Sequence, residues 1–534
     1  MLIGQHLWEQ AIISDMIHRT VSSEKEIVTY PVSYNTLYDM LVSTAALHGN
    51  KTAIVTNQPY TYSQLLTLVD AFSLVLSRTY CITPNQQVAT VLYNTIEHCI
   101  SLLALNKLGA VIIPLSTKST AKELSAIIAQ SDICLFLYES TIHDIIAPFS
   151  DSINGISSVD ILPFCQKVTS NPDFTDINSS NSVGSYTDMA AVLFTSGTTA
   201  QSKGVILKNY NLLHAIISYQ RILDLSFKDN LLLPIPLFYV TGLIAVFGLS
   251  IFIGSTLYLH KFFNPQHVLE TIKTHHISFL HASPTVFSKL LEYACEFPSL
   301  PSLRSFACGS SNMPKEKLLR IHQWLPELVF HTIYGLTETS SPATIFPNDA
   351  ATSPFIGSSG LPIPGVIIKI ITTAGIEAAA FETGEIFICG SVVLDSYYQL
   401  DTALLKDGWL ATGDIGYFNE QGYLFIVDRK KDMINRGGEK IWSFEVENAL
   451  YQMPAIKESA VFGISDEMYG ELPVAAIVVN PSYHLNASDI HTFLLTRISK
   501  YKIPVKYLFV DEIPLTRNSK VDKIALRKRF IHQL

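Results

Sequence analysis

The chain has 534 residues, enough for roughly two to four domains of ordinary size. Hydrophobic residues make up 48% and charged residues 16%, so the chain can bury a sizeable core and is not disordered. Lysine and arginine number 37 against 46 acidic residues; this net charge of −9 argues against nucleic acid as the main partner, because phosphate backbones bind basic faces. Seven scattered cysteines without a CxxC pair favour reduced thiols in a cytosolic protein over a disulfide framework or a zinc site.

Short β-rich runs alternate with helical patterns through the first half of the chain. Residues 51–77 read as a strand followed by a helix, and the same pattern recurs in residues 87–115, 123–138 and 267–284. Strands separated by helices of this size predict βαβ units and a parallel sheet. The fold class is therefore expected to be α/β.

The pattern changes after residue 363. Short strands and turns at residues 366–372, 383–390 and 422–428 predict a small β-rich subdomain, and the last hundred residues return to a mixed α+β pattern. The charged segment Asp428–Asp432 (DRKKD) lies between two complete patterns and is the best candidate for a junction. We expect a large N-terminal domain of βαβ layers over residues 1–428 and a small C-terminal domain over residues 429–534.

Val240–Leu259 contains no charged residue over twenty positions, a length that could span a bilayer. Gly254 and Ser255 divide it into a helical part and a β-rich part, and no basic cluster flanks either end. We expect a buried helix followed by a buried strand, with membrane contact as the alternative and no stable membrane span.

A strand runs into a loop rich in hydroxyls and glycine at Ala190–Val205 (AAVLFTSGTTAQSKGV). Backbone N–H groups, hydroxyls and one lysine in such a loop can surround phosphate oxygens. The pattern is not a Walker loop, which needs Gly before the Lys and Ser or Thr after it. An ordinary turn is the alternative. The candidate phosphate-binding residues are Thr195, Ser196, Gly197, Thr198, Thr199 and Lys203.

Further motifs follow in a fixed order. They are Pro236–Leu243 (PLFYVTGL), Gly309–Pro314, Tyr334–Glu338 (YGLTE), Gly384–Ile386 (GEI), Thr412–Asp414 (TGD), Asp428–Glu447 (DRKKDMINRGGEKIWSFEVE) and Pro514–Lys520 (PLTRNSK). With the loop above, they make the chain resemble the adenylate-forming superfamily of acyl-CoA synthetases, nonribosomal-peptide adenylation domains and beetle luciferases. The resemblance covers nearly the whole chain.

The resemblance implies two half-reactions. A carboxylic acid attacks the α-phosphorus of ATP to form an acyl-AMP with loss of pyrophosphate, and a thiol then attacks the acyl-AMP. Negative charge develops on phosphate oxygens in the first step, so cations and Mg²⁺ must already be in place. The expected cofactors are ATP, Mg²⁺ and CoA, or the phosphopantetheine arm of a carrier protein in place of CoA.

The resemblance assigns the nucleotide site to residues in three motifs. Glu338 would bind magnesium and Thr337 the α-phosphate, while Tyr334 would pack on adenine. Asp414 would accept from both ribose hydroxyls, and Arg429 would add a ribose or phosphate contact. Plainer alternatives exist for four of these residues. Glu338 could be a solvated loop residue and Tyr334 a core aromatic. Asp414 could form an Asx turn, and Arg429 a structural ion pair.

Lys520 is expected to reach the reacting carboxylate and α-phosphate, and with Glu338 and Thr195 it completes the predicted catalytic set. Lys431 lies where the family has its hinge between a large domain and a small mobile one. Gly437 and Gly438 would let pantetheine approach the backbone closely. The alternatives are a surface lysine for Lys520, an inert linker residue for Lys431 and a turn that needs positive φ for the two glycines.

The resemblance places the acid pocket at Tyr239, Gly309, Ser310 and Ile333. Tyr239 replaces a His, and Ile333 replaces a Gly that fatty-acid members have, which narrows the tunnel. No Asp stands in Pro236–Leu243 to hold a substrate ammonium, which disfavours an α-amino acid. We therefore favour a short, medium or aryl carboxylic acid. Three further departures lie near the phosphate loop and the lysine: Ala200, Ser202 and Ser519.

Three functions follow from these observations. The first is an ATP-dependent acid–thiol ligase that uses CoA in the cytoplasm. The second is acyl transfer to the phosphopantetheine of a carrier protein supplied in trans. The third, suggested by the departures and the apolar run, is a non-catalytic nucleotide-binding or acid-uptake protein.

Overall fold

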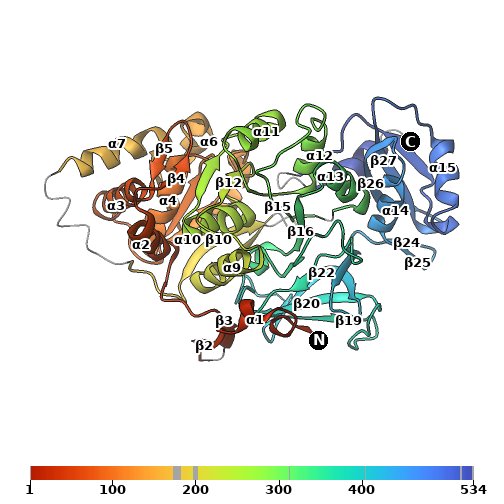
Figure 1. The fold of residues 1–534 in the computed structure, drawn as a ribbon, viewed down its shortest axis with the longest axis horizontal. Coiled ribbons are helices and arrows are strands. Elements are labelled where there is room, and N and C mark those ends of the chain that lie inside the picture. The colour runs from red at the N-terminus through yellow and green to blue at the C-terminus, as the bar shows by residue number, and fades with distance from the viewer. Residues whose placement is uncertain are drawn as a thin grey trace.

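The computed structural model describes residues 2–23, 25–171, 182–195, 202–311, 313–402, 404–516 and 520–531. Layers of helices and strands fill the left and centre of Figure 1, strands β19, β20 and β22 lie below them, and the C-terminal elements form a unit on the right. The predicted α/β class, with a β-rich subdomain and a small α+β C-terminal unit, is confirmed.

The largest sheet has nine strands within the described part of the chain. Its order is β18 (Leu361–Pro362), β17 (Thr344–Ile345), β16 (Val329–Tyr334), β15 (Ser305–Cys308), β14 (Phe279–Ala282), β12 (Asn230–Leu233), β13 (Thr256–Leu259), β4 (Thr52–Val55) and β5 (Pro59–Thr61). The strands from β16 to β4 in this order are mutually parallel, as the βαβ pattern predicts. Their carboxyl ends therefore share one edge, where α/β sheets bind ligands.

A second sheet is parallel except for one edge strand, β11. Its order is β11 (Lys203–Lys208), β10 (Met189–Thr195), β7 (Val111–Pro114), β6 (Gln87–Val91), β8 (Ile133–Tyr138) and β9 (Asn154–Ser157). Strand β11 runs antiparallel to β10, and their described pairing ends at Thr195 and Lys203.

Successive side chains of a strand point to opposite faces of its sheet, so each sheet has two apolar faces on which helices can pack. On β12, Leu231 and Leu233 face the main apolar core while Leu232 faces a second cluster on the opposite side. The helices of the main core are α2 (Leu37–His48), α3 (Tyr62–Thr79), α4 (Ile96–Lys107), α7 (Ser158–Thr169) and α9 (Asn209–Ile222). The outer clusters include α5 (Ala121–Ile128), α6 (His143–Ile146), α11 (Pro265–Thr274), α12 (Pro284–Leu291) and α13 (Lys315–Trp324).

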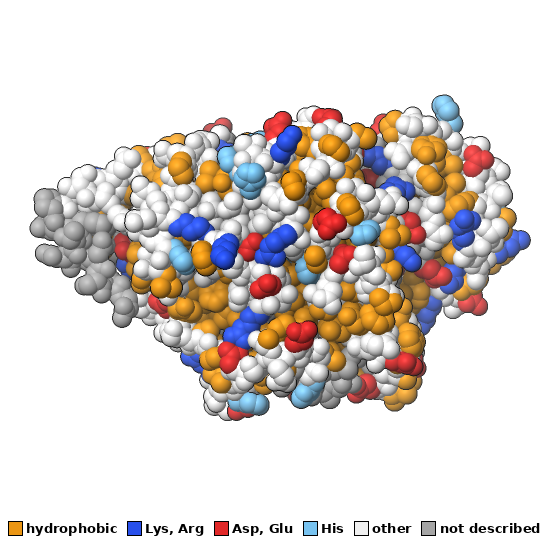
Figure 2. Space-filling view, viewed as in Figure 1, with side chains coloured by type: hydrophobic (Ala, Val, Ile, Leu, Met, Phe, Trp, Pro, Cys, Tyr) orange, Lys and Arg blue, Asp and Glu red, His pale blue; other side chains and the backbone are white. Residues whose placement is uncertain are grey.

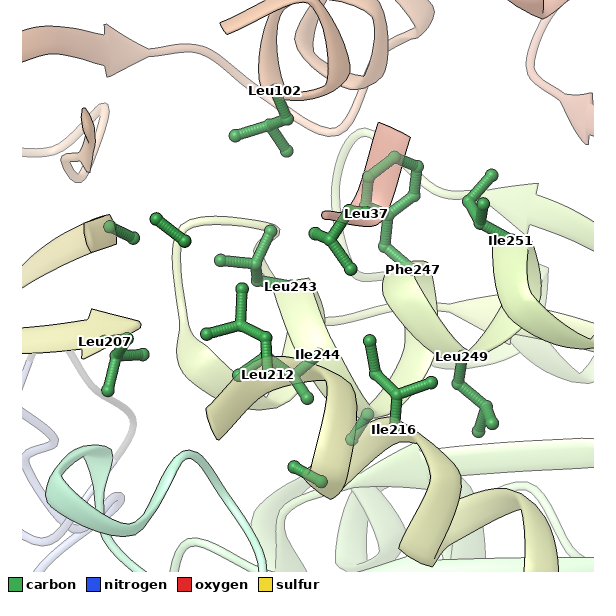
Figure 3. Packing of buried hydrophobic residues seen from close by; sticks show 14 of the residues in the cluster. Leu37, Leu102, Leu207, Leu212, Ile216, Leu243, Ile244, Phe247, Leu249 and Ile251 are labelled. Carbon is green, nitrogen blue, oxygen red and sulfur yellow. The ribbon is translucent and has the colours of Figure 1, made fainter. Parts of the chain in front are cut away.

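The uncharged run is part of the core. It forms a π-helix, η4 (Thr241–Gly248), then α10 (Leu249–Ile253), which ends at Gly254 with φ +72°, and then β13. In Figure 3, side chains of η4 and α10 lie among those of α2 and α9. The predicted buried helix and buried strand are confirmed. Within the described ranges, no helix combines the length and the apolar character that crossing a bilayer requires.

The β-rich subdomain is an antiparallel sheet of β1 (Leu2–Ile3), β19 (Val366–Ile371), β20 (Gly384–Gly390), β22 (Trp409–Phe418), β21 (Leu405–Lys406) and β23 (Leu424–Arg429). An N-terminal hairpin, β2 (Ile17–Ser22) and β3 (Lys25–Thr29), forms a small separate sheet. Because β1 pairs with β19, the start of the chain is tied to this subdomain.

The C-terminal unit has its own core. Its sheet contains β25 (Glu439–Ile441), β24 (Ile434–Arg436), β27 (Gly470–Val479), β26 (Ile456–Asp466) and β28 (Lys506–Phe509), and its helices are α14 (Ser443–Tyr451), α15 (Ala487–Leu495) and α16 (Lys523–Ile531). The buried members of its two apolar clusters all lie between Ile434 and Leu526. This separation is what the predicted domains 1–428 and 429–534 require, and the boundary stays a prediction.

Charged side chains are scattered over the molecule. On the face in Figure 2, lysines and arginines stand singly or in small groups among acidic residues and a large uncharged surface. All seven cysteines are unpaired, as predicted, and Cys99, Cys165 and Cys308 are buried.

Candidate active site

Three predicted nucleotide-binding residues meet where β16 ends beside β22 and β23. The Tyr334 hydroxyl donates to Asp414 Oδ2 at 2.8 Å, and Arg429 Nε lies 3.3 Å from Asp414 Oδ1. Asp414 is 4% exposed and faces Arg429 across the β22–β23 pair. Burial, with the Asp414 charge beside it, raises the pKa of Tyr334, so the phenol remains a donor. The cluster offers a ring face, a carboxylate and a guanidinium together.

Glu338 lies one turn further along, in η5 (Thr337–Thr339), next to Thr337. Its Oε1 accepts a hydrogen bond of 3.1 Å from the Tyr397 hydroxyl, and the Lys203 ammonium lies 5.6 Å from the centre of the Tyr397 ring. Burial raises the pKa of Tyr397, which keeps its proton. Tyr397 therefore joins the predicted magnesium ligand to the predicted phosphate-loop cation. Sequence analysis did not find Tyr397, because it lies outside every recognised motif.

The predicted phosphate loop lies between β10 and β11 in the sequence. Thr195 pairs with Lys203 as the last pair before the loop, and the Thr195 hydroxyl donates to the Lys203 carbonyl at 3.4 Å. Ser196, Gly197, Thr198, Thr199 and Ala200 lie outside the described residues, as does Ser519 near the lysine. On the described side after the loop, Lys203 lies near the Tyr397 ring and Val205 forms a β-bridge with Tyr397.

Lys520 belongs to the C-terminal unit and lies among charges of the site. Burial and the Arg429 charge lower the pKa of its ammonium, Asp414 and Glu338 oppose them, and the net result is a pKa of about 8. Burial and the Arg429 charge also lower the pKa of Lys431, the predicted hinge. The fold thus brings Lys520 to the residues with which the sequence associates it.

Lys520 is positioned by a short hairpin. Its carbonyl accepts from the Thr516 N–H at 2.7 Å, its own N–H donates to the Thr516 hydroxyl at 3.3 Å, and Leu515 forms a bridge with Val521. Lys520 therefore stands in a short paired segment rather than in a regular helix.

A buried contact connects the two units at the predicted junction. The Asp428 carboxylate is fully buried at the end of β23 and accepts from the backbone N–H of Ser443 and, at 2.7 Å, from its hydroxyl. Lys523 in α16 donates to the same Ser443 hydroxyl at 2.6 Å. Burial raises the pKa of Asp428. The sequence had identified the segment but not this contact.

The predicted acid-pocket residues come from three separate elements. Gly309 follows β15 and is buried, and a Cβ added to it would lie 3.4 Å from the Ile333 carbonyl oxygen of β16. Ile333 is 7% exposed. Ser310 is exposed with φ +74°, and Tyr239 precedes η4 with its ring against Phe238. The structure therefore brings Gly309 and Ile333 side by side.

Gly437 and Gly438 form the turn between β24 and β25. Their φ angles are +60° and +92°, and a Cβ on Gly438 would meet nothing within 4 Å. The turn therefore needs glycine for its conformation, while the space above it is open. It borders a groove of about 650 Å³ in the C-terminal unit, lined by Arg436, Gly437, Glu439, Tyr469, His491, Lys500, Tyr501, Ile503 and Val505.

A magnesium ion would fit Glu338 as a single protein ligand. In the part of the chain that the structure describes, no group of three or more His, Cys, Asp or Glu side chains could hold a metal. Mg²⁺ commonly takes one or two carboxylates and completes its shell with phosphate oxygens and water. Glu338, with Lys203 and Lys520 nearby, suits that arrangement because these cations share the phosphate charge.

Comparison with known proteins places this site in a family. Residues 41–398 match the AMP-binding enzyme family, and residues 445–520 match the AMP-binding enzyme C-terminal domain. The chain belongs to the AMP-binding enzymes. The resemblance inferred from the motifs is thereby confirmed over most of the chain.

Several CoA ligases are similar to this AMP-binding enzyme over nearly their whole length. Indoleacetate–CoA ligase of Aromatoleum aromaticum is 31% identical over 504 residues, covering 92% of this chain and 98% of that protein. Feruloyl-CoA synthase of an Amycolatopsis species is 28% identical, covering 91% and 96%.

A solved relative is the o-succinylbenzoate CoA synthetase of Bacillus subtilis in complex with its acyl-adenylate intermediate. It is 27% identical with a TM-score of 0.79, over 92% of this chain and 97% of that one. The same enzyme has been solved with ATP and a magnesium ion, at a TM-score of 0.77 over 90% and 98% of the two chains.

Proposed function

We propose that this AMP-binding enzyme activates an aryl or arylalkyl carboxylic acid with ATP and Mg²⁺ and transfers the acyl group to the thiol of CoA. The general reaction, formation of an acyl-AMP followed by transfer to CoA, is the predicted one and is confirmed by relatives that are CoA ligases along almost the entire chain. The carrier-protein acceptor and the non-catalytic alternative gain no support from them. The cytoplasmic location stays a prediction.

The observation that carries this proposal is the meeting of Lys520 with the nucleotide cluster. An ammonium from the C-terminal unit lies among Asp414, Arg429 and Glu338, where the acid carboxylate and the α-phosphate of ATP would be held. Two negative groups that must approach each other repel, so a positioned cation between them lowers the barrier.

Each residue has a defined task in the first half-reaction. Asp414 accepts from the ribose, Arg429 contacts ribose or phosphate, and Tyr334 lies against the base while holding Asp414 in place. Lys203 and Lys520 bind phosphate oxygens, and Lys520 also holds the acid carboxylate in line with the α-phosphorus. The bound Mg²⁺ would neutralise charge on the departing pyrophosphate.

Three arguments support the proposed substrate class. The relatives named above act on indoleacetate, feruloyl and succinylbenzoate groups, all of which contain an aromatic ring. In this chain, the buried Ile333 closes the region beside Gly309, which favours a flat ring over a long alkyl chain. Pro236–Leu243 offers no carboxylate for an ammonium group.

An ATP–pyrophosphate exchange screen over alkyl, aryl and amino acids tests this proposal. We expect exchange above background with aryl or arylalkyl acids, and then a thioester when CoA is added to the acyl-AMP. A purified phosphopantetheinylated carrier protein serves as the competing acceptor. Exchange limited to long alkyl acids or amino acids would contradict the proposed substrate class, and faster transfer to the carrier would contradict CoA.

A further inference from the structure

An irregular segment, residues 391–398, connects the predicted metal ligand with the strand that follows the phosphate loop. Its Leu394 N–H donates to the Glu338 carbonyl at 2.9 Å, so the segment runs beside the predicted metal ligand. Its Tyr398 N–H donates at 2.7 Å to the carbonyl of Gly204, the second residue of β11. Two parts of the site that are far apart in the chain are therefore joined by backbone hydrogen bonds to the same short segment.

Tyr397 lies in this segment and contacts a charged group of each part. Tyr397 is 5% exposed, its hydroxyl donates to Glu338 Oε1, and the Lys203 ammonium lies near its ring. Within the described residues, the Tyr397 hydroxyl is the only hydrogen-bond partner of the Glu338 carboxylate, and neither Glu338 nor Lys203 belongs to an ion pair. One side chain therefore contacts a carboxylate and an ammonium that are not paired with each other.

A carboxylate that binds Mg²⁺ as the single protein ligand has to present one oxygen in a fixed direction, because the ion demands near-octahedral geometry. Glu338 is only half-buried, and a free Glu side chain loses considerable rotamer freedom when it is fixed. The Tyr397 hydroxyl occupies Oε1 and leaves Oε2 for the ion. Hydrogen-bond partners behind a metal ligand commonly fix its orientation, and their loss weakens metal affinity or activity by about 10–100-fold.

The neutral phenol also suits a carboxylate that has to keep its charge for a metal ion. Burial and the Glu338 charge raise the pKa of Tyr397, so the hydroxyl stays protonated and donates. A cation such as Lys203 in the same place would neutralise Glu338 before the nucleotide arrives, and that ion pair would have to be broken when Mg²⁺ binds.

We infer that Tyr397 is a positioning residue for the magnesium ion, because its hydroxyl holds Glu338 with Oε2 available and its ring keeps the carboxylate from pairing with Lys203. This inference rests on the proposed function, since it takes Glu338 as the magnesium ligand. Tyr397 acts only through Glu338 in this role. Loss of its hydroxyl should therefore weaken metal-dependent binding of the nucleotide and leave metal-free binding unchanged.

Tyr397→Phe removes the hydroxyl and keeps the ring. The next residue provides the matched control: the Tyr398 hydroxyl accepts from Gln87 at 2.6 Å and donates to Asp132 at 2.8 Å, both outside the predicted site. Tyr398→Phe therefore makes the same chemical change in the same segment without touching the metal ligand. Glu338→Gln, alone and combined with Tyr397→Phe, completes a double-mutant cycle that shows whether the two residues act together.

Binding of α,β-methylene-ATP, followed by calorimetry in Mg²⁺ and in EDTA, measures the contribution of the metal without any catalysis. The measured quantity is the Kd in EDTA divided by the Kd in Mg²⁺. We expect Tyr397→Phe to reduce this ratio toward one, by about tenfold. Tyr398→Phe should leave the ratio unchanged, and Tyr397→Phe should have little further effect in the Glu338→Gln background.

The binding ratio decides the role of Tyr397 even if no acid supports pyrophosphate exchange, an outcome that would refute the proposed function alone. An unchanged ratio in Tyr397→Phe would overturn the inference. So would an equal fall in Tyr398→Phe, or an equal effect of Tyr397→Phe with and without the Glu338 carboxylate.

Glu338→Asp decides the matter if melting curves show that Tyr397→Phe does not fold. It keeps the charge but draws the carboxylate back from the Tyr397 hydroxyl. Its ratio should then fall nearly as far as that of Glu338→Gln. A ratio equal to that of the unchanged enzyme would overturn the inference.

Discussion

Removal of the Lys520 ammonium should slow the first half-reaction and leave the second nearly intact. Lys520 lies among Asp414, Glu338 and Arg429, where the acid and the α-phosphate of ATP are proposed to react. Loss of one positioned electrostatic donor usually slows the chemical step by about 10²–10³. We therefore expect Lys520→Ala to slow acyl-AMP formation by that factor, measured as ATP–pyrophosphate exchange.

The pH profile gives a second measure of the same amine. The active form is the ammonium, and the pKa of Lys520 is lowered from the ordinary 10.5 to about 8. The charge is present below that pH and is lost as the pH rises through it, so kcat/KM should fall about tenfold by pH 9. Lys520→Arg keeps its charge throughout this range, so its lower activity should lack this alkaline decline.

Thioester formation from synthetic acyl-AMP and CoA isolates the second step. Lys520→Ala should change this rate little, because the acyl-phosphate bond already exists. Gly438→Leu supplies the opposite defect: the space above Gly438 is open, and a bulky side chain there would obstruct the approach of pantetheine. If Lys520→Ala slows both steps equally, or neither, the role proposed for Lys520 is wrong.

Three further predictions concern the metal, the pocket and stability. Glu338→Gln keeps the side-chain shape but removes the charge, so magnesium-dependent exchange should fall much more than the melting temperature; equal losses would indicate a structural Glu. Ile333→Gly should shift kcat/KM toward longer acids by about fourfold per methylene, since each contributes ~0.8 kcal/mol, and an unchanged length series would remove Ile333 from the pocket. Burial raises the pKa of Glu447 to about 7 although Lys523 lies 3.7 Å away. Ionising Glu447 therefore destabilises the folded state above pH 7 but not below pH 4.5. Glu447→Gln should raise the free energy of unfolding at pH 8 by up to about 3 kcal/mol and change it little at pH 4.5. Urea titrations at the two pH values would measure this difference.

The sequence predicted features that are encoded by neighbouring residues. The βαβ layers, the β-rich subdomain and the fate of the uncharged run follow from hydrophobic periodicity and from the glycine that ends α10. The nucleotide residues Tyr334, Asp414 and Arg429 each stand in a contiguous motif, and the fold brings these motifs together.

The contacts that escaped prediction join segments far apart in the chain. Tyr397 reaches Glu338 across 59 positions, and Tyr219 reaches His281 across 62. A single tyrosine or histidine within an apolar pattern looks like any other core residue. Its hydrogen-bond partner is determined by the packing of strands and helices, which periodicity does not specify.

The carboxyl end of β23 bears on how a small unit could supply the lysine proposed for the first half-reaction. Arg429, the last residue of the strand, pairs with Asp414 of β22 in the subdomain sheet, so the strand is fixed to the N-terminal layers up to that point. The neighbouring Asp428 bonds instead to Ser443 at the start of α14. If the C-terminal unit rotates as the resemblance implies, the rotation would begin after Arg429, and Lys431 as the hinge stays a prediction. Such a rotation would break the contact between Asp428 and Ser443 and withdraw Lys520, while Asp414 and Arg429 would stay on the nucleotide.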